Sequence, residues 1–362
     1  MSITKEQVQQ TAGEIIDVNT EKSLEVTKSI KSVEVDGGKT SITISLGYPA
    51  AGYFDELKKL VTEAVSALDG VESVEVKVSS KIMSHAVQQN LKPQQNIKNI
   101  IAVASGKGGV GKSTTAVNLA LALQAEGATV GILDADIYGP SMPRMLGCTG
   151  QPESVDGKSL EPKVGHGIQV MSIGFLVEED TPMIWRGPMV TQALEQLLND
   201  TNWKDIDYMI IDLPPGTGDI QLTLAQKIPV SGAVIVTTPQ DIALLDARKG
   251  LKMFEKVEVP VLGVVENMSI HICTECGHAE QIFGEGGGSR MATEYGVDFL
   301  GALPLDIKIR EHADDGHPTV ASMPDSKVSE IYREIARKTA AKLATKAKDH
   351  SSAFPSIVIE NN

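Results

Sequence analysis

The chain has 362 residues, of which 41% are hydrophobic, and it carries a formal net charge of −14 and three cysteines. The negative charge argues against nucleic-acid binding as the main function, because phosphate contacts need clustered Lys and Arg. An odd cysteine count does not suit a secreted disulfide framework, and neither a membrane-spanning run nor the apolar region of a signal peptide is present. We therefore expect a cytoplasmic protein without a membrane span.

Residues 1–80 have the pattern of a small α+β domain. The expected elements are a helix over 6–18, strands over 30–35 and 40–46 around a Gly-Gly turn, a helix over 54–68 and a strand over 71–78. This unit resembles the DUF59/MIP18-like domain that often precedes iron–sulfur carrier ATPases. Members of that family often carry a cysteine just before the second helix, but residues 48–52 contain none. We therefore interpret the unit as an interaction module.

Residues 81–98 are polar and lack an apolar period, which is typical of a linker. Over residues 99–348, short apolar runs alternate with helical segments. This alternation predicts an α/β domain with a mostly parallel sheet covered by helices on both faces. Ligands of such sheets bind at the carboxyl ends of the strands. We expect residues 349–362 to form a flexible C-terminal tail.

The stretch Gly106-Lys107-Gly108-Gly109-Val110-Gly111-Lys112-Ser113, followed by Thr114, fits the phosphate-binding pattern G-x-x-x-x-G-K-[ST]. An apolar strand precedes it and a helix follows it, which is the context that the motif requires. The glycines let successive N–H groups face one anion, and the helix N-terminus adds its dipole. Lys112 is expected to reach the β- and γ-phosphates of ATP, and the Ser113 hydroxyl to bind Mg²⁺. The motif predicts a P-loop NTPase.

Lys107 gives this P-loop a second lysine. Such a cation is either surface charge or a group that neutralises the transferring phosphoryl, as an arginine finger does. The pattern GKGGVGKST resembles the deviant Walker A ATPases, in which the early lysine reaches across a dimer to the partner's nucleotide. The resemblance implies a homodimer closed by ATP, with Lys107 acting on the nucleotide of the other subunit.

Polar motifs also follow three later strands of the expected sheet. Asp134 and Asp136 form a D-x-D. In the resembled ATPases the second carboxylate of this motif positions the attacking water, and the resemblance implies this role for Asp136. It also implies that Asp134 contributes to the Mg²⁺ shell. Asp212 occupies the Walker B position that holds Mg²⁺, and the N–H of Gly216 in the following loop is a candidate donor to the γ-phosphate. The amide of Asn267 suits an adenine edge, and the resemblance implies a base contact there.

Cys273 and Cys276 form a C-x-x-C, which is half of a four-thiolate set for zinc or an iron–sulfur cluster. No second such pair exists, and Cys148 lies far away in sequence, where we expect a buried apolar role. A twofold mate would supply two more thiolates. The alternatives are a Cys₂His zinc site with His271 or His278, and a redox dithiol.

Taken in order, GKGGVGKST, DxD, WRGPM, DLPPGTGD, ENMS and CxxC resemble the Mrp/ApbC-type iron–sulfur cluster carrier ATPases over about residues 98–340. The resemblance implies a homodimer that binds and slowly hydrolyses ATP and holds a labile [4Fe–4S] cluster between its subunits. It also implies donor or scaffold proteins that supply the cluster and apo-proteins that receive it. The alternatives are a MinD/ParA-like positioning ATPase, with a basic amphipathic helix over 328–348 on lipid, and a nitrogenase-reductase-like electron-transfer ATPase.

Overall fold

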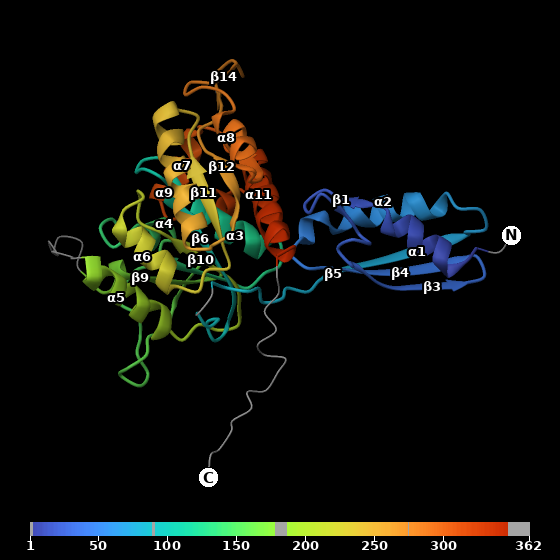
Figure 1. The fold of residues 1–362 in the computed structure, drawn as a ribbon, viewed down its shortest axis with the longest axis horizontal. Coiled ribbons are helices and arrows are strands. Elements are labelled where there is room, and N and C mark those ends of the chain that lie inside the picture. Colours follow the sequence, from blue (N-terminus) through green and yellow to red (C-terminus); the bar gives the residue numbers. More distant parts are fainter. Residues whose placement is uncertain (1–2, 89–90, 178–186, 274, 347–362) are drawn as a thin grey trace, which may run out of the picture.

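The structure is a computed structural model that describes residues 3–88, 91–177, 187–273 and 275–346. It contains a small N-terminal α+β unit that projects from the side of a larger α/β unit (Figure 1). In the larger unit, helices cover both faces of one twisted sheet. This architecture confirms the predicted fold class. The expected C-terminal tail and the Trp-Arg pair of the WRGPM motif lie outside the described residues.

The N-terminal unit packs two helices against a three-stranded sheet. Its elements are α1 (Lys5–Gly13), β1 (Ile16–Asp17), β2 (Lys22–Ser23), β3 (Ile30–Asp36), β4 (Lys39–Leu46), η1 (Ala51–Tyr53), α2 (Phe54–Ser66) and β5 (Ser73–Ser80). Strand β4 is central, antiparallel to β3 and parallel to β5. Helix α2 buries Leu57, Val61 and Val65, which share one face at a spacing of four residues. The helical spacing and the alternating strands of the sequence therefore produce the layers of this unit.

The large sheet has the strand order β15-β12-β11-β6-β10-β7-β9-β8. All neighbours are parallel except the edge pair β8 and β9. The strands are β6 (Ile97–Ala104), β7 (Val130–Asp134), β8 (Lys163–Gly165), β9 (Ile168–Ser172), β10 (Ile206–Asp212), β11 (Gly232–Thr237), β12 (Val261–Glu266) and β15 (Phe299–Ala302). Every residue of β7 and β11 is buried, as expected for strands covered on both faces. Because β6 lies between β10 and β11, the loop after β6 sits at the middle of the sheet's carboxyl edge.

Helices and short elements complete the larger unit. They are α3 (Lys112–Ala125), α4 (Met142–Met145), η2 (Ile173–Phe175), α5 (Gly187–Asn199), α6 (Asp219–Lys227), α7 (Asp241–Lys256), β13 (His271–Ile272), β14 (Ala279–Glu280), α8 (Gly287–Tyr295), α9 (Ile307–Asp314), α10 (Thr319–Ser322) and α11 (Lys327–Ala344). Helix α3 is enclosed between the sheet and α11, and every residue from Thr115 to Leu123 is buried. Apart from Asn118, whose side chain donates to the Thr114 carbonyl and accepts the Val320 N–H, the residues of that segment are small or apolar, so no polar face turns it toward water.

The two units also meet outside the connector between them. Glu126, at the carboxyl end of α3, is buried, and its Oε2 accepts a hydrogen bond from the N–H of Gly52 at 2.8 Å. Its Oε1 accepts one from Nη1 of Arg337 on α11 at 2.7 Å. The backbone carbonyl of Glu126 accepts the N–H of Ala51 at 3.2 Å. The loop before α2 is therefore a docking contact between the two units.

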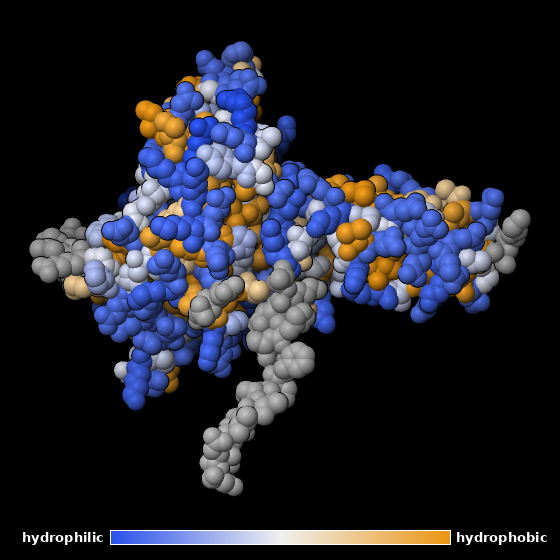
Figure 2. All heavy atoms as spheres, viewed as in Figure 1, coloured by the Kyte–Doolittle hydropathy of each residue, from blue (hydrophilic) through white to orange (hydrophobic). Residues whose placement is uncertain are grey.

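None of the described helices combines the length and the apolar character that a membrane crossing requires. The face of the molecule seen in Figure 2 is mostly hydrophilic, with hydrophobic residues scattered in small groups.

Candidate functional site

The P-loop connects β6 to α3 and forms a phosphate-sized cradle. Gly109 and Gly111 both have φ of 81°, in the left-handed region that favours glycine. Gly111 is the N-cap of α3 and supplies no capping side chain, so the first N–H groups of the helix are available to a ligand. The adjoining pocket of 230 Å³ is lined by Ser105, Lys107, Gly108, Gly109, Gly111, Lys112, Ser113, Thr114, Asp136, Met145 and Pro215. The structure therefore brings most of the predicted phosphate-binding residues and Asp136 to one hollow.

Lys112 and Asp212 form a buried ion pair beneath this pocket. The Lys112 Nζ lies 2.6 Å from Oδ1 of Asp212 and 3.2 Å from the Ser113 hydroxyl. The other carboxylate oxygen, Oδ2, is buried and has no hydrogen-bond partner among the described residues. A hydroxyl beside an unpartnered carboxylate oxygen is the oxygen chemistry that a hydrated Mg²⁺ needs. The residues present thus fit a magnesium nucleotide.

The two carboxylates of the D-x-D motif have different surroundings. Asp134 is fully buried, and its Oδ2 accepts hydrogen bonds from the Ser141 N–H at 2.9 Å and the Ser172 hydroxyl at 3.0 Å. Burial, followed by the nearby negative charge of Asp212, raises the pKa of Asp134 to about 7. Asp136 lines the pocket, and partial burial raises its pKa. Asp134 therefore supports the loop, whereas Asp136 faces the space where phosphates are expected.

Gly216 and Asn267 both contact the P-loop region through protein groups. The N–H of Gly216 donates to the carbonyl of Ser105 at 3.0 Å, so a contact with a γ-phosphate requires this loop to shift. The Asn267 amide donates to the carbonyl of Val110 at 2.9 Å, and its oxygen accepts the N–H of Met268 at 2.9 Å. A Cβ on Gly111 would lie 2.2 Å from this amide. Asn267 thus holds the P-loop backbone, a role that its sequence context did not indicate, and its contact with a base stays a prediction.

The C-x-x-C lies at the end of a short hairpin. Strands β13 and β14 pair antiparallel, and the backbone closes with a hydrogen bond from the Cys273 N–H to the His278 carbonyl at 2.9 Å. Cys276 is exposed and Cys273 is partly exposed. Hydrogen bonds from the backbone of Cys276, then of Glu275, lower the pKa of Cys273. The projection that carries β14 is covered mostly by hydrophilic residues (Figure 2).

The described part of the chain brings no third metal ligand to this hairpin. Within it, no three Cys, His, Asp or Glu side chains lie close enough together to hold a metal ion. His271 instead places Nδ1 3.1 Å from the carbonyl of Leu305. Cys148 is buried, as predicted, and burial raises its pKa. The Cys₂His alternative therefore has no assembled ligand set in the conformation described.

Comparisons with known proteins agree with this geometry. Residues 96–340 match the family described as NUBPL iron-transfer P-loop NTPase, and residues 5–78 match an iron–sulfur cluster assembly protein domain. The chain is 52% identical to the iron–sulfur cluster carrier protein of Haemophilus influenzae, over 93% of this chain and 91% of that one. It is 50% identical to the mouse iron–sulfur cluster transfer protein NUBPL, over 76% and 86% respectively.

A solved structure shares the fold of the larger unit. The nucleotide-binding protein of Archaeoglobus fulgidus in complex with ADP is 38% identical and has a TM-score of 0.55, covering 64% of this chain and 90% of its own. The family match covers the β6 strand, the P-loop, both aspartate motifs and the cysteine hairpin. The resemblance predicted from the motifs is therefore confirmed: the chain belongs to the family of NUBPL iron-transfer P-loop NTPases.

Proposed function

We propose that the chain is an ATP-binding, slowly ATP-hydrolysing carrier of a labile [4Fe–4S] cluster. Two subunits hold the cluster between them through Cys273 and Cys276 of each chain, receive it from a donor or scaffold protein and transfer it to apo-proteins. The relatives named as iron–sulfur carriers support the cargo. Membership of a P-loop NTPase family supports nucleotide hydrolysis.

The observation that carries this proposal is the isolated pair of thiols. A cluster of this type takes four thiolates, and the described part of one chain groups only two of them at the hairpin. Twofold symmetry repeats the same patch on a second copy. The exposed position of Cys276 supports an approach of that copy, because an exposed thiol is accessible from outside the chain.

Nucleotide binding supports the same scheme. The P-loop N–H groups bind the phosphates, Lys112 neutralises them, and Ser113 with Asp212 holds the Mg²⁺ shell. When bound, the metal supplies charge neutralisation for phosphoryl transfer. Asp136 orients the attacking water, and Lys107 of the second copy stabilises charge on the phosphoryl group. The nucleotide selects between two dimer geometries and so between retention and release of the cluster.

The rival positioning function depends on an amphipathic helix that lies on lipid. Helix α11 instead buries its apolar residues, including Tyr332, Ile335 and Leu343, against α3 and β15. Its described residues leave no apolar face for a bilayer, so the structure offers this rival no support.

Anaerobic reconstitution with iron and sulfide tests the proposal. We expect about four irons per dimer and the visible absorption of a [4Fe–4S] cluster. Either Cys273→Ala or Cys276→Ala removes two of the four ligands and abolishes stable loading. ATP binding persists in both variants, because the P-loop lies at a different strand end.

Cys148→Ala is the matched control and keeps full loading, since that thiol is buried away from the hairpin. One zinc per monomer, bound without sulfide and without visible absorption, would establish the zinc alternative instead. A cluster that cycles between redox states without ever leaving the protein would point to the electron-transfer alternative.

A further inference from the structure

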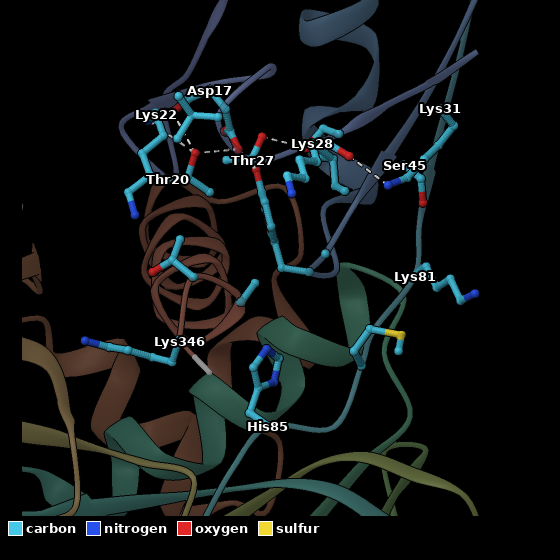
Figure 3. Close-up of a pocket in the computed structure, with 18 residues that line it drawn as sticks. Asp17, Thr20, Lys22, Thr27, Lys28, Lys31, Ser45, Lys81, His85 and Lys346 are labelled. Atoms are coloured by element: carbon cyan, nitrogen blue, oxygen red, sulfur yellow. Dashed lines mark hydrogen bonds between the residues drawn. The ribbon is translucent and has the colours of Figure 1, made fainter. Parts of the chain in front are cut away.

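A second pocket, of 630 Å³, lies where the two units and their connector meet. Its walls come from the segment between β1 and β3, the end of β4, the start of the connector and the end of α11 (Figure 3). It shares no lining residue with the pocket at the P-loop. The volume falls in the range of about 300–1,000 Å³ that is usual for small-molecule sites.

The lining of this junction pocket is strongly cationic although the chain is acidic. Five lysines line it, from three separate segments: Lys22, Lys28, Lys31, Lys81 and Lys346. In Figure 3, Lys81 and Lys346 stand on opposite sides of the space. The only carboxylate among the lining residues is Asp17, which is buried and accepts hydrogen bonds from the Tyr48 hydroxyl at 2.8 Å and the Thr20 hydroxyl at 3.0 Å. Asp17 is thus occupied within the protein.

The lysine charges are not neutralised by the described part of the chain. Within it, none of the five lysines forms an ion pair with a carboxylate. Five like charges around one hollow repel one another, and an anion between them relieves that repulsion.

The backbone at Lys28 adds an independent observation. Its φ is 53°, in the left-handed region that a lysine rarely occupies. The loop is fixed by hydrogen bonds from the Lys28 N–H to the Glu25 carbonyl and from the Ser29 N–H to the Leu24 carbonyl, both 2.9 Å. The Lys31 ammonium donates to the Lys28 carbonyl at 2.7 Å. Strained residues concentrate at ligand-binding loops, and here the strain fixes a lysine at the pocket wall.

We propose that the junction pocket binds a small molecule with two or more anionic groups, phosphate or carboxylate. The spread of the lysines over three segments calls for several negative groups. A small ligand suits the site better than an acidic protein, because the net charge of −14 repels an acidic macromolecule. A small anion inside the pocket is screened from distant charges beyond about 8 Å at physiological salt. Since both units supply lysines, the bound ligand also fastens the units together.

Calorimetric titration of the full chain with two probes tests this inference. Pyrophosphate represents the phosphate source, and tricarballylate represents the carboxylate source. We expect tricarballylate to bind one site per chain, and pyrophosphate to bind this site and also the P-loop, with affinities that fall as salt increases. Lys28→Gln and Lys81→Gln should each weaken binding about fivefold, the factor expected for one charge-assisted contact. Lys28→Arg should retain the affinity because it keeps the charge.

Lys308→Gln is the matched control, an exposed lysine on α9 that does not line the pocket. The variants at Lys28, Lys81 and Lys308 alter exposed side chains, and equal thermal midpoints would confirm that they are folded. Binding of either probe with the expected losses supports the site, and the responding probe identifies the anion type. Absence of binding for both probes would overturn the inference. A binding heat that disappears only in Lys112→Ala would also overturn it, because that result places the anion at the P-loop.

Discussion

At the scale of single residues, burial decides what each charged group at the P-loop does. Lys112 is 6% exposed and Asp212 is fully buried, so the charge of each residue is compensated by the opposite charge of the other. Removing one partner of such a pair leaves an uncompensated charge and costs about 3–5 kcal/mol. A change at Lys112 therefore affects stability as well as phosphate binding, and the two effects need separate variants.

Lys112→Ala should weaken ATP binding by at least about tenfold, through loss of a charge contact with the phosphates, and should lower the free energy of unfolding by roughly 3 kcal/mol. In the double variant with Asp212→Ala, the stability should largely return while binding stays weak. Calorimetric titration with ATP measures the binding affinity, and unfolding in urea measures the free energy of unfolding. Wild-type turnover in the single variant would contradict a P-loop mechanism.

Asn267 has two possible roles that nucleotide fragments distinguish. If its amide mainly holds the Val110 carbonyl, as the contact of 2.9 Å indicates, Asn267→Ala should weaken ADP and pyrophosphate binding by similar factors. If it reads the base, ADP binding should fall and pyrophosphate binding should not. We expect the first pattern, with a loss of about fivefold for both ligands, as for one hydrogen bond of about 1 kcal/mol. The ratio of the two losses, measured by titration, decides between the roles.

At the scale of elements, periodic segments were predictable and short or long-range features were not. The short apolar runs between residues 99 and 348, which predicted a parallel sheet, lie in β6, β7, β9, β10, β11, β12 and β15, because strands covered on both faces are apolar throughout. Strand β8 has only three residues and exposes Val164, so it gives no such signal. Helix α1 ends at Gly13, well before the predicted limit, as the weak helix propensity of glycine favours.

In the candidate site, too, local motifs were predictable from the sequence and long-range contacts were not. The P-loop and both aspartate motifs were readable because their chemistry depends on local spacing along the chain. The contact of Asn267 with Val110 and that of Glu126 with Gly52 join residues distant in sequence. No local pattern encodes such pairs, since any amide or carboxylate at those positions looks like a surface group until the sheet brings the partners together.

The docking of the N-terminal unit on α3 makes a further prediction. Glu126→Gln should remove the ion pair with Arg337 and lower the free energy of unfolding by roughly 2 kcal/mol, the scale of a buried hydrogen bond to a charged group. Looser docking should speed tryptic cleavage after Lys81 in the connector. Glu63→Gln, on the exposed face of α2, is the control and should change neither quantity. Unchanged cleavage in Glu126→Gln would mean that the connector alone sets the arrangement of the units.

At the scale of the whole molecule, the proposed dimer makes one catalytic site from two chains. Lys107 lines the pocket of its own P-loop and forms no ion pair within the described part of the chain. Its charge is therefore available to a phosphate on either side of a twofold axis. Mixed dimers distinguish an action of Lys107 on its own subunit from an action on the other subunit.

Lys107→Ala and Asp136→Ala should each be nearly inactive in ATP hydrolysis, and mixing them should restore part of the activity. In the mixed dimer, one of the two sites receives an intact Asp136 from its own chain and an intact Lys107 from the other. The measurement is turnover against mixing ratio, with mixed dimers verified by mass. No recovery at any ratio would show that Lys107 acts within its own subunit.

The enclosure of α3 makes this helix one of the last parts of the molecule to expose its backbone amides to solvent. A helix buried on every side exposes its amide hydrogens only when the surrounding unit unfolds, whereas a hairpin of two-residue strands opens at almost no free-energy cost. Hydrogen exchange should therefore be slowest in the middle of α3 and among the fastest around Cys276. The thiols can therefore bind or release the proposed cluster on the timescale of local opening, while the helix behind the P-loop stays closed.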